Sequence, residues 1–96
     1  MAIPVDATGY PFFVNENEVI GRSILTMGVY DLVVAECLTR LLKSNQCFYD
    51  VGANIGYFTR LALAQGARTT SFEPHPQIFS RLTENTKNFQ QADVQA

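Results

Sequence analysis

The feature that most constrains this chain is a glycine turn placed between a short apolar run and an amphipathic segment. The run Cys47–Val51 is apolar and aromatic, as expected of a β-strand that is buried on both faces. Gly52–Asn54 predicts the turn, and residues 55–65 predict a helix with Asn54 as N-cap and Gly66 as the C′ residue. This strand–turn–helix unit predicts an α/β fold.

The flanking sequence repeats the alternation of helix and strand. Residues 69–72 predict a second strand, Pro76 suits the first turn of a further helix, and Val94 opens a third strand. Ahead of the first strand, apolar residues recur at helical spacing, at Val33, Val34, Cys37, Leu38, Leu41 and Leu42. The order predicts a Rossmann-like parallel sheet with helices on both faces, truncated after the first two or three core strands.

Composition and charge exclude several classes of protein. Hydrophobic residues make up 47% and charged residues 17%, which indicates a globular chain, and the net charge of -2 without a basic stripe gives no sign of a nucleic-acid partner. The first residues lack a secretory signal, and no apolar stretch approaches the roughly 20 residues of a membrane span. We therefore expect a cytoplasmic protein.

The cysteines and the other metal-binding residue types do not form a ligand pattern. Cys37 and Cys47 are ten positions apart and match no metal-binding motif, so we expect reduced core residues. The alternative is a disulfide in a secreted domain. No cluster of His, Asp and Glu has metal-ligand spacing, and we predict no metal.

The run from Asp50 to Gly56 has the chemistry of a cofactor loop. Gly52 permits a tight turn and lets a ligand lie against the backbone, because it has no Cβ. The N-terminus of the next helix offers N–H groups and a partial positive charge to an anionic group. Asp50, at the carboxyl end of the strand, can accept hydrogen bonds from an ammonium group of the ligand. Ala53 and Asn54 complete the loop.

The glycine spacing distinguishes between two cofactors. A dinucleotide fingerprint requires G-x-G-x-x-G, but here Asn54 occupies the second glycine position and Tyr57 the third. The glycines at 52 and 56 therefore favour S-adenosylmethionine over NAD. Glu73 ends the next strand about 20 residues beyond the loop, where an acidic residue takes ribose hydroxyls. The alternative is that Glu73 is only an exposed carboxylate at a strand end.

Three motifs resemble the FkbM family of methyltransferases. The longest is the run from Asp50 to Thr59, the second is Phe72-Glu73-Pro74-His75-Pro76, and Gly28-Val29-Tyr30-Asp31 resembles the family's G-x-Y-E signature with Asp in place of Glu. The resemblance extends from about residue 21 to residue 88. It implies a class I methyltransferase fold, S-adenosylmethionine as cofactor, and usually O-methylation of sugar or natural-product hydroxyls.

The resemblance also implies which residues contact the cofactor and how the chain is divided. The expected cofactor-binding residues are Asp50, Gly52, Ala53, Asn54, Gly56, Glu73 and Pro74. Residues 28–96 then form the incomplete front half of the cofactor-binding domain, because later strands that complete the substrate pocket are absent. Residues 1–27 form a lead-in, in which Pro11–Val14 and Val19–Ile20 predict a β-hairpin.

The catalytic group is not identified by the sequence. His75, the single histidine, is a candidate general base, and the alternative is that it caps the helix at Pro76 or lines the adenosine site. Tyr30 and Asp31 are either an N-cap with a packed aromatic or contacts to the methionine end or the substrate. Of Tyr57 and Phe58, we expect one to pack in the core and the other to face the ligand.

Three functions remain open at this point. The first is a methyltransferase, or the cofactor-binding half of one, acting on a small-molecule hydroxyl. The second is an NAD-type nucleotide-binding module, and the third is an inactive truncated fragment whose sheet edge pairs with another chain. The sequence identifies neither the methyl acceptor nor the oligomeric state.

Overall fold

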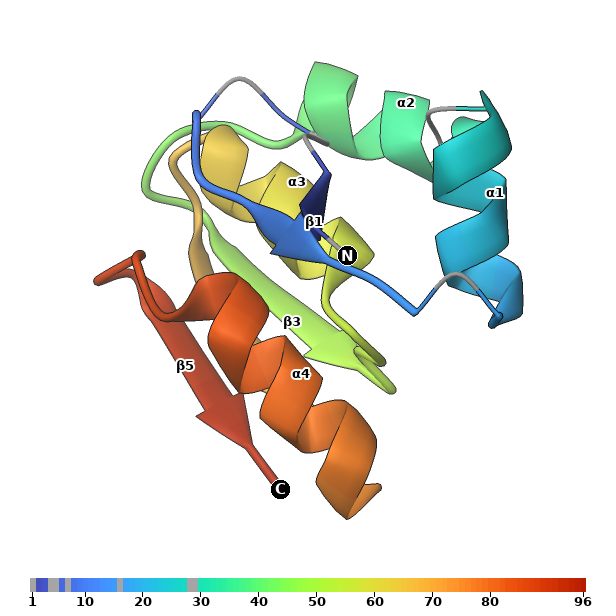
Figure 1. Ribbon diagram of the computed structural model, residues 1–96. Helices are drawn as coiled ribbons and strands as arrows, with labels where there is room; N and C mark the ends of the chain where they lie inside the picture. The colour runs from blue at the N-terminus through green and yellow to red at the C-terminus, as the bar shows by residue number, and fades with distance from the viewer. Residues whose placement is uncertain (1, 4–5, 7, 16, 28–29) are drawn as a thin grey trace.

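The computed structural model describes the chain except residues 1, 4–5, 7, 16 and 28–29 (Figure 1). A small antiparallel pair of strands and two helices precede a parallel sheet with alternating helices. The elements are β1 (Ala2–Ile3), β2 (Phe12–Phe13), α1 (Val19–Met27), α2 (Leu32–Leu41), β3 (Cys47–Val51), α3 (Tyr57–Ala64), β4 (Arg68–Phe72), α4 (Pro76–Thr86) and β5 (Ala92–Gln95).

The parallel sheet has the strand order β3-β4-β5, and β1 pairs with β2 in a separate sheet. The connection from β3 to β4 through α3 and the connection from β4 to β5 through α4 both move one strand along the sheet in the same direction. Since such connections are right-handed, α3 and α4 lie on the same face of the sheet. Phe48 is level with Thr69 and Asp50 with Ser71, and these side chains point toward the helices. The predicted parallel α/β sheet is confirmed, and so is the strand at Val94.

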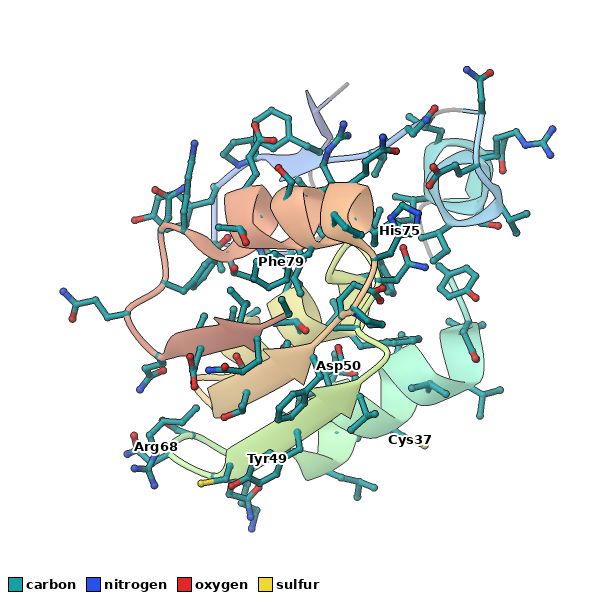
Figure 2. The ribbon with its side chains drawn as sticks, turned by 90° about the horizontal axis from the view of Figure 1, so that it is seen from below. Cys37, Tyr49, Asp50, Arg68, His75 and Phe79 are labelled. Atoms are coloured by element: carbon teal, nitrogen blue, oxygen red, sulfur yellow. The ribbon has the colours of Figure 1, made fainter. Side chains whose placement is uncertain are left out.

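The other face of the sheet is open. Tyr49 is 66% exposed, Val51 is 81% exposed, and Phe72 on the neighbouring strand is partly exposed as well. Figure 2 shows Tyr49 and Asp50 on the same strand, and their burial alternates with the pleat. The expectation that β3 is buried on both faces is therefore wrong, because no described residue packs over its outer face tightly enough to bury it.

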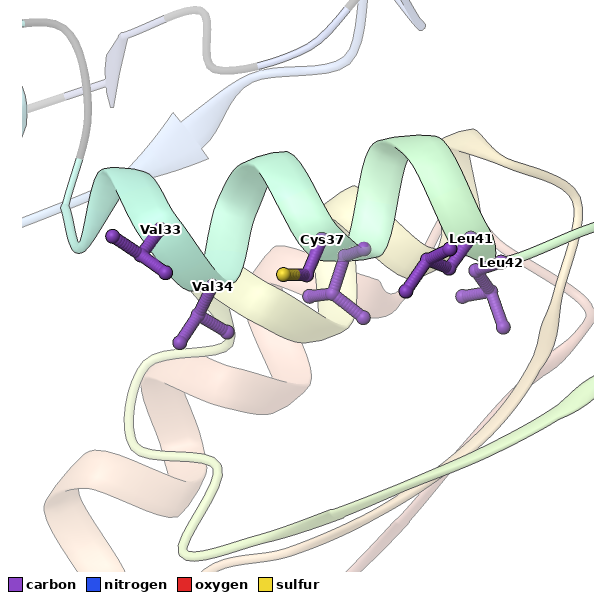
Figure 3. Close-up of a pocket in the computed structure, with 6 residues that line it drawn as sticks. Val33, Val34, Cys37, Leu41 and Leu42 are labelled. Atoms are coloured by element: carbon purple, nitrogen blue, oxygen red, sulfur yellow. The ribbon is translucent and has the colours of Figure 1, made fainter.

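The apolar stripe of α2 is exposed too. Val33 and Leu41 are each 73% exposed, and Figure 3 shows the stripe pointing away from the helix into a shallow groove. The groove has a volume of about 280 Å³ and is lined by Val33, Val34, Cys37, Leu38, Leu41 and Leu42. Cys37 and Cys47 are both free thiols, but both are exposed, so the expectation of core cysteines is wrong.

The N-terminal segment differs from the expected hairpin. Phe12–Phe13 is a strand, but its partner is Ala2–Ile3, and residues 19–27 are helical. Ile20 and Ile24 lie one turn apart and face the core, so the apolar period is that of a helix. A Cβ at Gly21 would collide with the carbonyl oxygen of Asn15, so the approach of this segment to α1 requires glycine.

The core lies between the N-terminal segment and the helices α1, α2 and α3. Its buried members include Phe12, Val14, Ile24, Ala35, Ile55, Tyr57 and Leu61. The N-terminal segment thus covers α3 and the end of the glycine loop, and it forms one side of the region around this loop.

Arg60 of α3 holds this segment in place from the inside. Its side chain is fully buried, and its Nε lies 3.1 Å from Oδ2 of Asp6. The guanidinium also donates to the carbonyl oxygens of Tyr10, Pro11 and Asn85, at 2.8, 2.7 and 3.1 Å. A buried guanidinium needs such partners, because an unpaired charge in the interior is strongly destabilising.

Among the described residues, no helix is long and apolar enough to cross a membrane. The same residues contain no group of three His, Cys, Asp or Glu side chains that could hold a metal ion.

Candidate functional site

The candidate site lies at the edge of the sheet where β3 and β4 end. Because parallel strands end on the same side, the loop after Val51 and the residues after Phe72 are neighbours. Gly52 and Ala53 confirm this, since both N–H groups donate to the carbonyl oxygen of Phe72 at 2.9 Å. The edge thus joins the two segments that the sequence predicted to bind one ligand.

The backbone conformation at position 52 requires glycine, and the space next to this residue is open. Its φ of 74° lies in the left-handed region, which glycine adopts without a steric penalty. A Cβ at this position would have no neighbouring atom within 4 Å, and the residue is exposed. The loop therefore has room for a ligand directly against its backbone, as predicted.

Gly56 has a packing role at the start of α3. It is buried, its φ is 95°, and a Cβ there would lie 2.8 Å from Cδ1 of Leu82. The glycine thus allows close packing of α3 against α4 and does not face open space. Gly56 is also the N-cap of α3, so the prediction that Asn54 caps this helix is wrong, whereas Gly66 is confirmed as the C′ residue with a φ of 85°.

The backbone N–H groups of the loop donate hydrogen bonds within the chain. The N–H of Ile55 donates to Oδ1 of Asn54 at 2.8 Å, and the N–H of Gly56 donates to the carbonyl oxygen of Ala53 at 3.0 Å. With the bonds of Gly52, Ala53 and Asn54, each N–H from residue 52 to residue 56 already has an acceptor in the chain. The loop backbone is therefore held rigidly, and its N–H groups are not a ready anion cradle.

Glu73 is the residue that connects the two loops. Its Oε1 accepts from the N–H of Asn54 at 2.8 Å, and its Oε2 accepts from the N–H of His75 at 3.1 Å. The side chain is only 8% exposed, so Glu73 is not the exposed strand-end carboxylate of the alternative interpretation. Since an ionised carboxylate offers about four lone-pair positions, each oxygen can accept one further hydrogen bond.

Asp50 points toward the helix layer. Its Oδ2 accepts from the hydroxyl of Thr59 at 2.7 Å, and this hydroxyl lies 2.7 Å from Oγ of Ser71. Burial raises the pKa of the Asp50 carboxyl, and hydrogen bonds from Thr59 oppose the shift. Asp50 thus anchors the end of β3 to the first turn of α3.

His75 begins α4. Its Nδ1 accepts from the N–H of Ile78 at 3.5 Å, and Pro76 follows at the first helical position. Figure 2 shows His75 at the start of this helix. This geometry confirms the capping role proposed for His75. Pro74, the remaining predicted contact, is exposed between Glu73 and His75.

Two cavities adjoin the loop. One, of about 150 Å³, lies between Ile20 of α1, Tyr30 and the loop, and it is lined also by Gly52, Ala53, Asn54, Ile55, Tyr57 and Phe58. The other, of about 280 Å³, is more polar and is lined by Asn15, Glu18, Ile55, His75, Gln77, Ile78 and Arg81. Ile55 borders both cavities, so they flank the glycine loop.

Sequence reasoning found the loop and Glu73 but missed several neighbours. Thr59 and Ser71 are buried partners of Asp50 and its loop, and Ile20 lines the smaller cavity. The helical spacing of Ile20 and Ile24 is the signal that could have placed Ile20 on the inner face of α1. Tyr57 packs in the core, as expected for one member of this pair, and Phe58 is half-buried at the cavity.

No protein-family model matches the chain, and no curated protein matches it. Solved structures do. A TehB-like SAM-dependent methyltransferase from Corynebacterium glutamicum matches 77% of the chain with 15% identity and a TM-score of 0.61. TYW2 from P. horikoshii, in complex with MeSAdo, matches 93% with 15% identity and a TM-score of 0.64. A putative sarcosine dimethylglycine methyltransferase from Galdieria sulphuraria matches 67% with 20% identity and a TM-score of 0.53.

Because the sequence identities are low, these likenesses show the fold alone. The chain spans 39%, 33% and 28% of the lengths of the three structures. The chain therefore has the α/β fold of part of these proteins.

Proposed function

We propose that the chain binds S-adenosylmethionine and forms the cofactor-binding part of a methyltransferase. The observation that carries this proposal is Glu73, a buried carboxylate that holds the loop after β3 and the loop after β4 together while keeping acceptor capacity. A carboxylate at the end of the second strand, beside a glycine turn, is suited to a ribose diol. The methyltransferases among the structural neighbours support the assignment.

The residues present fit this cofactor better than NAD. Open space above Gly52 lets a ligand lie against the backbone, and the free lone pairs of Glu73 can accept two ribose hydroxyls. Tyr57 occupies the position of the third glycine in a dinucleotide fingerprint, and its ring is buried in the core. The loop N–H groups are already bonded, which is unfavourable for a pyrophosphate that needs them.

The chain would bind and orient the cofactor, which supplies an electrophilic methyl group. Glu73 would hold the ribose, and the rigid loop from Gly52 to Gly56 would fix its position. The acceptor's hydroxyl group would have to be held beside that methyl group, and its proton would pass to a base or to water. We assign no base, because Nδ1 of His75 is used as a helix cap.

The finer assignment rests on the sequence motifs. We propose membership of the FkbM family and O-methylation of a small-molecule hydroxyl from the resemblance at residues 50–59 and 72–76. A cytoplasmic location is proposed separately, because Cys37 and Cys47 are free thiols. We also propose that residues 28–96 are the front half of the cofactor-binding domain. The exposed stripe of α2 and the open sheet face at Tyr49 and Val51 support this, since such apolar surfaces are normally covered.

The direct test is ligand binding to the chain and to variants of Glu73. Thermal unfolding is followed with S-adenosylmethionine, S-adenosylhomocysteine and NAD, and ligand at 100 times its dissociation constant adds about 2.7 kcal/mol of stability. Glu73→Gln keeps the shape of the side chain but removes its charge, and we expect at least about a tenfold loss of affinity, because hydrogen bonds to charged groups are strong.

The matched control is Glu84→Gln on α4, which should leave affinity unchanged. Stabilisation by NAD alone would support the nucleotide-binding alternative. A cooperative transition with no response to any of the three ligands would refute the proposed site, and the inactive-fragment alternative would then hold.

A further inference from the structure

The outer side of α2 carries a line of apolar side chains that no described residue covers. Val33, Cys37 and Leu41 are four residues apart, so they lie along one line on the helix (Figure 3). Val33 and Leu41 are each 73% exposed, and the thiol of Cys37 is exposed between them. A continuous apolar line of this kind marks a surface that another protein element covers.

The inner side of α2 is fixed to the body of the chain. Ala35 is buried and belongs to the same core cluster as Tyr57 and Leu61 of α3. At the start of the helix, Oδ1 of Asp31 accepts from the N–H of Val34 at 3.3 Å. The helix is thus held from one side, and it presents the line of Val33, Cys37 and Leu41 on the other.

The line is complementary to itself. In an antiparallel pair of α2 helices with a two-fold axis at Cys37, Val33 lies opposite Leu41 of the second copy, and Leu41 lies opposite Val33. Each of these contacts joins a smaller and a larger apolar side chain, and the two Cys37 side chains meet at the axis. A two-fold dimer requires a surface that matches itself in this way.

The charges beside the line match in the same arrangement. Glu36 and Arg40 each precede a residue of the line, so they share one flank of it, and they form an exposed ion pair at 2.9 Å. A two-fold axis brings this flank of both helices together and reverses one helix, so Glu36 lies near Arg40 of the second copy. The two ion pairs then form a group of four alternating charges. A parallel pair lacks these contacts, because each flank faces the opposite flank of the second helix.

We propose that α2 packs antiparallel against α2 of a second copy of this chain, about a two-fold axis at Cys37. The side chains of the second copy then fill the groove of about 280 Å³ along the stripe. This inference goes beyond the proposed function and needs no cofactor, since the residues that line the groove lie at positions 33–42, apart from the glycine loop.

The expected dimer is weak. Each helix has 10 residues and offers only a short line of contact. Such an interface falls below the roughly 1,200 Å² that a stable complex buries. We therefore expect a dissociation constant between about 10 μM and 1 mM. At the low micromolar concentration of an unfolding experiment, the chain is then a monomer.

Sedimentation equilibrium under reducing conditions, at protein concentrations from about 10 μM to 1 mM, measures the association. Val33→Lys and Leu41→Lys should each weaken the dimer at least about tenfold, because two lysines would be buried against apolar side chains. Leu32→Lys is the matched control, since Leu32 is on the same helix and 60% exposed but lies outside the line, and it should leave the association unchanged.

A pair of charge variants tests the flank. Arg40→Glu makes the flank of Glu36 and Arg40 wholly acidic, and Glu36→Lys makes it wholly basic. We expect each variant alone to associate about two- to fivefold more weakly than the wild type, because exposed charges contribute little, and an equal mixture of the two to recover the wild-type association. Circular dichroism verifies that each variant is folded, and the charge variants decide the question for any lysine variant that is not.

Oxidative cross-linking tests the antiparallel arrangement. In Cys47→Ser, a mild oxidant should link the two Cys37 thiols, each of which loses a proton and an electron to the oxidant. With both native cysteines replaced by serine, Val33→Cys should link to Leu41→Cys in a mixture but not to itself. Position 33 of one copy lies about 12 Å along the axis from position 33 of the other, beyond the roughly 7 Å that a disulfide spans.

Three results would overturn the proposal. The first is a chain that stays monomeric up to about 1 mM, in which case the stripe is covered by a different protein element. The second is a folded Leu41→Lys variant that dimerises like the wild type, and the third is a Val33→Cys variant that links to itself.

Discussion

Replacement of Arg60 by methionine tests the packing of the N-terminal segment most directly. Methionine keeps much of the side-chain length and can remain between the rings of Phe12 and Phe89, which lie 5.6 and 5.1 Å from the guanidinium carbon. The substitution leaves Asp6, whose side chain is 3% exposed, buried without its ion-pair partner. It also leaves three backbone carbonyl oxygens without their donor.

The expected loss follows from the cost of an unpaired buried charge. Removing one partner of a buried ion pair costs about 3–5 kcal/mol, and a domain of this size has a total stability of about 5–15 kcal/mol. For a small domain, 1 kcal/mol corresponds to a Tm shift of about 4–8 °C, so we expect Tm to fall by at least about 12 °C. Thermal and urea unfolding, followed by circular dichroism, measure the change.

The chain provides a matched control in Arg40→Met. Arg40 forms an ion pair of similar length with Glu36, 2.9 Å against 3.1 Å, but both side chains are exposed on α2. We expect a much smaller shift there, because exposed pairs contribute little. Asp6→Asn keeps an acceptor for Arg60 and should give an intermediate loss. Equal shifts for the two arginine variants would refute the argument from burial.

Four further substitutions test the roles assigned to the loop and the open surface. Gly56→Ala should cost about 1–3 kcal/mol in urea unfolding and more than Gly52→Ala, because both have positive φ but only position 56 lacks space for a Cβ. Equal losses would contradict the packing of Gly56 against α4. For Asp50→Asn, the free energy of unfolding relative to that of the wild type should increase as the pH rises from about 3 to 7. The pKa of Asp50 is raised in the folded state, so ionisation of this carboxyl lowers the stability of the wild type but not that of the variant. A pH-independent difference in Tm between these two proteins would exclude that cost. Leu41→Lys should change stability by less than about 0.5 kcal/mol in urea unfolding, because its side chain is 73% exposed. A large loss of stability would show that the stripe is packed in solution.

The sequence alone determined the local elements and the place of the candidate site. The 3.6-residue and two-residue periods, the glycine after a strand and the proline at the start of a helix are local signals, so α2, β3, β4, α4 and β5 were predicted near their observed positions. The pairing of the glycine turn with Glu73 was also predictable, because parallel strands end at the same edge. His75 as a cap followed from Pro76 in the same way.

Only the tertiary structure decided how these elements are buried and what each site residue contacts. Periodicity gives an apolar face but not whether another element covers it, so the outer face of β3 and the thiols of Cys37 and Cys47 were expected in the core. Gly56 proved to be a packing glycine because Leu82, distant in sequence, lies against it. The smaller cavity beside the glycine loop depends on contact between Tyr30, which precedes α2, and Phe58 of α3. This contact is a result of long-range packing that no local sequence pattern predicts.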